Sequence, residues 1–219
     1  LQGMPAQTFR LEALALQGNV LVDSGKTAAE GQFEFSCKPK EETLYRLKFA
    51  MGKYILLALK KGDHAEIKGD WSMLENYTVE GSAGSKTLKG FLVNLRENIR
   101  DIRTVQLILD SAKANPGRDS IRRSAEDDLR NINTRFLSYV KKFADTTQSL
   151  SAALFAVNII NPKREGAYVT SFYKQVEKRF PGSATAKAFA DRFLKHEGTA
   201  VVPGESNDRN MAPDFSAQT

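Results

Sequence analysis

Residues 85–117 read SKTLKGFLVNLRENIRDIRTVQLILDSAKANPG, and this stretch decides the fold of the second half of the chain. Apolar side chains recur in it at alternating intervals of four and three residues, which is typical of one face of a long helix. The positions of this seam are Leu88, Leu92, Leu95, Ile99, Ile102, Gln106 and Leu109, with Gln106 as its polar member. Asn115, Pro116 and Gly117 then end the helix, because proline and glycine interrupt helical hydrogen bonding.

A second apolar stripe of matching length follows this turn, at Ile121, Ala125, Leu129, Ile132, Phe136, Val140 and Phe143. Two such seams joined by a tight turn predict a long antiparallel helix hairpin. Three shorter helices are expected after it, each preceded by a capping residue or a break. They are a helix capped by Ser149 or Ser151 that runs to Ile160, a helix at about residues 165–179, and a helix capped by Ser183 that runs to about His196.

The first 80 residues have a different pattern, in which short runs of alternating polarity are separated by turns. Seven strands are expected, at residues 8–16, 20–22, 32–37, 43–50, 54–59, 64–68 and 77–79. Residues 54–59 (YILLAL) are almost entirely apolar, which predicts a strand that is covered on both faces. The spacing of the strands indicates an antiparallel sandwich or barrel.

Together these patterns predict an α+β chain. Its expected parts are an antiparallel β-sandwich domain at residues 1–81, a helical region at residues 82–198 that contains the helix hairpin, and a polar linker from residue 199. Exposed sandwich edges favour cover by helices or by a second copy, so a homodimer is an expected assembly.

The composition excludes several classes of protein. Cys37 is the single cysteine, so the chain holds no Cys-x-x-Cys redox pair, no internal disulfide and no four-cysteine zinc site. No apolar run approaches the ~20 residues that cross a bilayer. Residues 1–9 lack the basic start and the apolar centre of a signal peptide, which leaves open a signal that was removed earlier.

We expect no catalytic, cofactor-binding or metal-binding residues in this chain. His64 and His196 are isolated from each other and from any nucleophile in the sequence, which favours solvated or structural roles. The acids of residues 126–128 fan out around a helix and have arginines beside them, as on a solvated helix face. Cys37 follows an alternating segment and is expected to be a partly buried structural thiol.

The net charge of +6 is concentrated in the helical region, since residues 82–200 hold 21 basic and 12 acidic side chains. Arg96, Arg100 and Arg103 form a stripe at helical spacing. Nucleic acid is not expected as a partner, because single-strand binding usually adds exposed aromatic side chains and the aromatics here lie on the apolar seams. An acidic membrane surface or another domain of the same protein is an alternative for this stripe.

Several short motifs, in order, resemble a β-rich domain of unknown function that precedes thioredoxin-like domains in Bacteroidetes-type envelope proteins. The matching segments are residues 20–24 (VLVDS), 30–35 (EGQFEF), 45–47 (YRL), 61–63 (KGD), 69–70 (GD) and 180–183 (FPGS). Glu30 stands where that family has aspartate. Residues 211–217 (MAPDFSA) resemble the first edge of the redox domain in the peroxiredoxin and thiol–disulfide oxidoreductase superfamily.

This resemblance implies a non-catalytic N-terminal scaffold or interaction region of a thioredoxin-like protein of the periplasm or outer cell envelope. Residues 199–219 would then be a linker and the first residues of a truncated thioredoxin-like domain, the expected partner of the chain. Membrane anchoring through a removed lipoprotein signal is also implied. The alternative is a glycan- or peptide-binding module, with a groove between sandwich and hairpin and with exposed aromatics such as Trp71 or Tyr77 as contacts. For Trp71, a role in plugging one end of the sandwich is an equal alternative.

Overall fold

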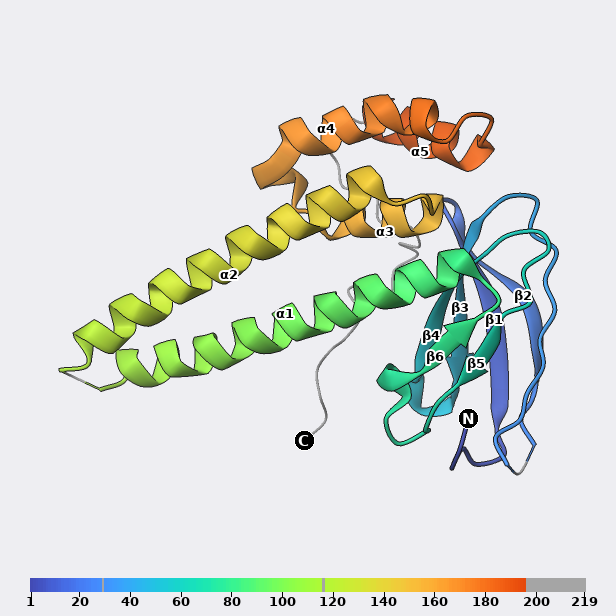
Figure 1. Cartoon of the computed structure of the whole chain (residues 1–219), viewed down its shortest axis with the longest axis horizontal. Helices are drawn as coiled ribbons and strands as arrows, with labels where there is room; N and C mark the ends of the chain where they lie inside the picture. The colour runs from blue at the N-terminus through green and yellow to red at the C-terminus, as the bar shows by residue number, and fades with distance from the viewer. Residues whose placement is uncertain (29, 116, 196–219) are drawn as a thin grey trace.

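The computed structural model describes residues 1–28, 30–115 and 117–195 (Figure 1). The strands are β1 (Thr8–Ala15), β2 (Gly18–Lys26), β3 (Thr43–Phe49), β4 (Tyr54–Leu59), β5 (Glu66–Lys68) and β6 (Thr78–Glu80), with short 3-10 helices η1 (Ala50–Gly52) and η2 (Leu74–Asn76) between them. The α-helices are α1 (Ala83–Lys113), α2 (Asp119–Thr146), α3 (Leu150–Ile159), α4 (Pro162–Arg179) and α5 (Ala184–Lys195). The predicted succession of an antiparallel sheet followed by helices is confirmed.

Four strands form one antiparallel sheet in the order β2-β1-β3-β4, and β5 and β6 form a second antiparallel pair. In this register Leu11 lies opposite Leu47, and Leu47 lies opposite Ile55. Because side chains of a strand alternate between the two faces, all three residues project from the same face of the sheet. That face is buried, with Leu11 and Leu47 fully inaccessible to solvent.

The first hydrophobic core lies on this face of the sheet, under β5, β6 and residues 31–39. Its buried members are Met4, Phe9, Leu11, Tyr45, Leu47, Phe49, Ile55, Leu57, Leu59, Trp71, Leu74, Tyr77 and Val79. Trp71 contacts Phe49 edge to face, with ring centroids 5.5 Å apart, and the Lys53 ammonium lies 4.5 Å from the indole centroid. The indole therefore belongs to this core and is not a surface contact.

Residues 32–37 are not a strand, so this one of the seven expected strands is wrong. The alternation itself is present, since Phe33 and Phe35 pack against the first core while the residues between them are exposed. The Ser36 amide, however, donates to the Asp23 carboxylate at 2.6 Å and not to a carbonyl of a ladder. An alternating pattern reports which side chains are buried and does not specify backbone pairing.

Strand β4 is buried on both faces, as the sequence predicted. Ile55, Leu57 and Leu59 belong to the first core, whereas Leu56 and Ala58 face the helices. On that second face they pack with Leu88 of α1 and Ala152 of α3. The four-stranded sheet is thus the middle layer between the β5–β6 pair and the helices.

Side chains close the unpaired edge of β4. The Ser82 and Ser85 hydroxyls each donate to the Ala58 carbonyl at 3.0 Å, and the Tyr77 hydroxyl donates to the Leu56 carbonyl at 3.1 Å. Ser82 is also the N-cap of α1, whose Ser85 amide donates to its hydroxyl. Edge protection and the start of the longest helix therefore depend on the same two serines.

Helices α1 and α2 lie side by side and extend together away from the sheet (Figure 1). Near the sheet the predicted seam is buried at Leu88 and Leu95, with Phe91 beside it. Towards the turn between the helices, Leu107 is 72% exposed and Ile121 is 45% exposed. Leu109 of α1 and Ala125 of α2 are nevertheless buried there, so the predicted seam continues into the outer part of the helix pair.

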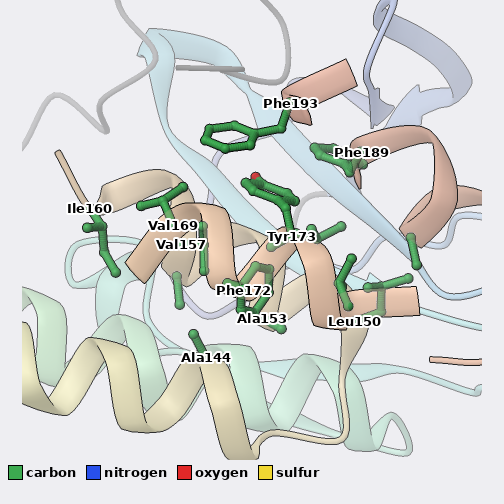
Figure 2. Packing of buried hydrophobic residues seen from close by; sticks show 14 of the residues in the cluster. Ala144, Leu150, Ala153, Val157, Ile160, Val169, Phe172, Tyr173, Phe189 and Phe193 are labelled. Carbon is green, nitrogen blue, oxygen red and sulfur yellow. The ribbon is translucent and has the colours of Figure 1, made fainter. Parts of the chain in front are cut away.

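Helices α3, α4 and α5 enclose a second hydrophobic core with the inner ends of α1 and α2 (Figure 2). Tyr173 of α4 stacks on Phe193 of α5 with ring centroids 4.5 Å apart, and it contacts Phe172 edge to face. Helix α3 lies at the centre of this core, which explains why its sequence is apolar on nearly every side.

The expected helix starts are confirmed with one correction. Ser149 caps α3, and the Ser183 hydroxyl accepts from the Ala186 amide at 3.1 Å in α5. Helix α4 begins one turn earlier than expected, at Pro162, because Asn161 caps it and proline is well suited to the first turn. Glu165 has non-helical backbone angles, so a kink near the expected start separates this first turn from the rest of the helix. The expected end of α5 at His196 lies outside the described residues.

Two adjacent glutamates at the start of β3 link the sheet to two helix N-termini. The Glu41 carboxylate accepts from the Ser183 hydroxyl at 2.5 Å and from the Thr185 amide at 2.9 Å, at the start of α5. The Glu42 carboxylate accepts from the Ser149 hydroxyl at 2.7 Å and from the Ser151 amide at 2.9 Å, at the start of α3. A carboxylate at a helix N-terminus also interacts favourably with the helix dipole.

Candidate functional site

The described residues form a groove of about 670 Å³ between α1 and the segment that contains η2 and β6. One wall is the side of α1 that carries Lys86, Lys89, Gly90, Val93, Arg96 and Arg100. The other wall includes Glu75, Asn76, Tyr77 and Glu80. The groove therefore lies at the junction of the sheet and the helices, where the first core meets α1.

The sequence places this wall of α1 opposite its buried side. Positions 86, 93 and 100 repeat every seven residues, as do positions 89 and 96, so each set lines up along the helix. Leu88, Phe91 and Leu95 occupy the side that packs on the protein interior. Burial of that side fixes the rotation of α1 and turns its basic side towards the groove.

The wall opposite α1 is held by Tyr77. Its ring is only 5% exposed, and its hydroxyl is bound to the Leu56 carbonyl. The expectation that Trp71 and Tyr77 are exposed ligand contacts is therefore wrong, because both complete the first core. Tyr77 instead supports the groove from below.

Lys89 is the least solvated cation of the groove. Its ammonium donates to the Glu75 carbonyl and lies 4.1 Å from the centroid of the Tyr77 ring. Burial, together with the nearby positive charge of Arg96, lowers the pKa of Lys89 to about 8. A negatively charged group beside Lys89 would offset both effects, since an opposite charge favours the protonated amine.

The other cations differ in how far their charge is already compensated. Lys86 forms an ion pair with Glu80 at 2.9 Å, and Arg96 donates to the Asn76 side chain at 3.4 Å. Within the described part of the chain, the Arg100 guanidinium has no hydrogen-bond or ion-pair partner. Arg100 is therefore the cation most available to a ligand.

Only part of the basic stripe expected from the sequence lines the groove. Arg96 and Arg100 line it, and Arg103 lies outside it. On α2, Arg122 pairs with Asp119 at 3.2 Å and with Glu126 at 3.3 Å, so the acids near residue 126 belong to a salt-bridged helix face, as the sequence indicated. Sequence analysis did not single out Lys89 or Gly90, although their place on the same side of α1 as Arg96 and Arg100 was a usable signal.

The other residues considered from the sequence do not converge on a site. Cys37 is half-buried, and burial, with smaller contributions from Asp23 and Asp63, raises the pKa of its thiol, which disfavours the reactive thiolate. His64 is exposed, and His196 is outside the described residues. Among the residues that the structure describes, no group of three or more histidine, cysteine, aspartate or glutamate side chains could hold a metal ion.

No family model matches the chain, and no curated protein or solved structure is significantly similar to it. None of the helices in the described ranges is long and apolar enough to cross a membrane.

We expect Lys89, the lysine of the groove that has a lowered pKa, to react with amine acylating agents at unusually low pH. Since the pKa of Lys89 is about 8, its acylation rate should rise with pH to a midpoint near that value. Peptide mapping by mass spectrometry measures the rate at this site, and Lys89→Gln removes the signal. A rate at Lys89 that is still rising steeply above pH 10 would contradict the described burial.

Gly90→Ala is expected to raise the free energy of unfolding by about 1 kcal/mol, because glycine in a helix interior is disfavoured and no atom lies within 4 Å of the added Cβ. Gly84→Ala, on the same helix, is the matched control. Its Cβ would lie 2.6 Å from the Glu42 carboxylate and 2.8 Å from the Ala58 carbonyl, so it should destabilise the fold. Urea unfolding measures both changes, and a loss of stability in Gly90→Ala would show that the groove is not open.

Proposed function

We propose that this chain is a non-catalytic scaffold and interaction region of a cell-envelope protein whose redox chemistry resides in a thioredoxin-like domain. The observation that supports the proposal is the hydrogen bonding of Glu41 and Glu42, beside the sheet, to the N-termini of two helices. Each carboxylate connects the start of β3 to a helix more than 100 residues away in sequence. A body held in this way suits the positioning of another domain.

Within this proposal, residues 1–81 form a β-sandwich domain in which β5, β6 and residues 31–39 are the second layer. Residues 82–198 form the helical region, with α1 and α2 as an antiparallel hairpin. Residues 199–219 serve as the linker and the first residues of the thioredoxin-like domain. The proposed location is the periplasm or outer cell envelope, with a lipoprotein anchor and a homodimer as further parts of the proposal.

The proposal assigns no catalytic residue to this chain. Cys37 is its single thiol, and the raised pKa of that thiol makes it a poor nucleophile. In an insulin-reduction assay with dithiothreitol, we expect this chain and its Cys37→Ser variant to give the uncatalysed rate. A rate above that background that is lost in Cys37→Ser would contradict the non-catalytic role.

The link to a redox domain is tested by the coding sequence on either side of this chain. Codons for a Cys-x-x-Cys motif within a thioredoxin-like domain after Thr219, and a lipoprotein-type signal before Leu1, would support it. A reading frame without any thioredoxin signature would contradict it.

A second candidate function is the binding of a glycan or peptide ligand, and the groove on α1 favours it. Ligand sites usually combine a concave surface with a few convergent polar groups. Here Lys89, Arg96 and Arg100 line one groove, together with the apolar side chain of Val93. The two candidate functions are compatible, since a scaffold can hold its partner through this groove.

A further inference from the structure

Gly90 leaves the backbone of α1 uncovered in the middle of the groove. An added Cβ at this position would meet no atom within 4 Å, so the fold itself does not require glycine here. Glycine in a helix interior destabilises a helix, and one of its uses is to let a ligand or another backbone approach closely. Gly90 therefore leaves room for a ligand to approach the backbone of α1 closely.

The groove is long for a small ligand. The positions from Lys86 to Arg100 span 14 steps of the helix, which at 1.5 Å per residue is about 21 Å. An extended peptide rises about 3.3 Å per residue, so about six residues would follow the groove from end to end. Lys89, Arg96 and Arg100 are distributed along this length and are not gathered at one point.

The charges of the groove favour an acidic peptide over a nucleic acid. Glu75, Glu80 and Glu97 lie among the cations, and they would repel the closely spaced phosphates of an oligonucleotide. Base stacking requires exposed aromatic faces, whereas the Tyr77 ring is buried and covered by Lys89. A peptide with separated carboxylates can place them on the cations and offer its amide groups to the glutamates.

We propose that the groove between α1 and the η2–β6 segment binds an extended acidic peptide segment across Gly90, with its carboxylates on Arg96, Arg100 and Lys89. The proposal rests on the groove-binding function given above as the second candidate and names the class of its ligand. The arginine contacts are charge-assisted hydrogen bonds, which are about twice as strong as neutral ones. Binding should weaken as salt is raised, because the contacts are partly solvated.

The test is fluorescence anisotropy with a labelled six-residue peptide of alternating glutamate and glycine. We expect Gly90→Leu, which fills the groove, and Arg100→Glu, which reverses its free cation, each to weaken binding at least about tenfold. The matched controls are Gly166→Leu on α4, where an added Cβ also meets open space, and Arg103→Glu, one turn beyond the groove on α1. Both controls should change the affinity less than about twofold.

Three comparison probes separate the outcomes: a lysine–glycine peptide of the same length, a neutral oligosaccharide and a short oligothymidylate. Failure of the acidic peptide to bind, or binding that Gly90→Leu does not weaken, would overturn the proposal. Tighter, groove-dependent binding of oligothymidylate would replace it with a nucleic-acid site. Groove-dependent binding of the basic peptide or of the oligosaccharide alone would overturn the acidic ligand while leaving the groove-binding function in place. If Gly90→Leu weakens the binding of none of these probes, the acidic-peptide proposal and the groove-binding function both fail.

Discussion

Replacing Glu41 and Glu42 together by alanine is expected to lower the free energy of unfolding by about 4 kcal/mol. Hydrogen bonds to charged groups contribute about 1.5–3 kcal/mol each to stability, and the loss of an N-cap costs about 0.5–2 kcal/mol. Glu42→Ala should have the larger single effect, because the Ser149 and Ser151 groups that it leaves unpaired belong to residues that are only 5% exposed. Urea unfolding followed by circular dichroism measures these changes.

The Glu41 carboxylate makes stability depend on acid pH. Burial raises the pKa of Glu41, but hydrogen bonds from Ser183 and Thr185 outweigh burial, and the net effect is a lowered pKa. A group whose pKa is lower in the folded state contributes stability above its unfolded pKa and loses that contribution as the pH falls through the folded pKa.

Glu41→Gln should therefore flatten the acid side of the profile of unfolding free energy against pH. Glu177→Gln, at an exposed site, is the control. An unchanged acid limb in Glu41→Gln would show that this link does not stabilise the fold.

Phe91→Ala is the other change with a large expected effect, a loss of about 3–5 kcal/mol. Phe91 is completely buried and lies where three helices meet. Its ring stacks on Phe143 of α2 at 4.5 Å and meets Phe155 of α3 edge to face at 6.2 Å. Removal of the ring would leave a cavity that these rigid aromatic neighbours cannot fill.

Leu107→Ala, on the same helix, is the control for this cavity. Because Leu107 is 72% exposed, its truncation should change stability by less than about 0.5 kcal/mol. Comparing the thermal unfolding of the two variants separates the effect of losing a buried side chain from the effect of alanine on helix propensity. Equal effects at the two positions would contradict the described packing of α1.

The elements that could be predicted from the sequence are those specified by local patterns. The continuous apolar run of residues 54–59 correctly predicted a strand buried on both faces. The seam from Leu88 to Leu109 and the capping serines at 149 and 183 correctly placed helices. In each case the deciding feature, a period or a cap, lies within one short stretch of chain.

The features that could not be predicted depend on residues far apart in the sequence. Residues 32–37 alternate as a strand does, but the hydrogen bonds of their backbone go to the Asp23 carboxylate and the Ala28 amide and not to a neighbouring strand. Nothing local to Glu41 and Glu42 indicates that they cap helices that begin after residues 149 and 183. The groove likewise requires η2 and β6 to lie beside α1, so the basic stripe alone did not reveal it.

The proposed functions share one physical requirement, which is a sheet and a helical region that behave as one body. The groove has one wall on α1 and the other on η2 and β6, so independent motion of the two regions would disperse its charged groups. A scaffold that positions a partner domain needs the same rigidity.

Urea unfolding observed with two probes tests this requirement most directly. Trp71 is the single tryptophan and lies in the first core, so its fluorescence reports on the sheet, while circular dichroism at 222 nm reports mainly on helices α1 to α5. If the sheet and the helices unfold cooperatively, both probes give the same midpoint and slope. Two separated transitions, with the helices unfolding while Trp71 stays buried, would contradict the account.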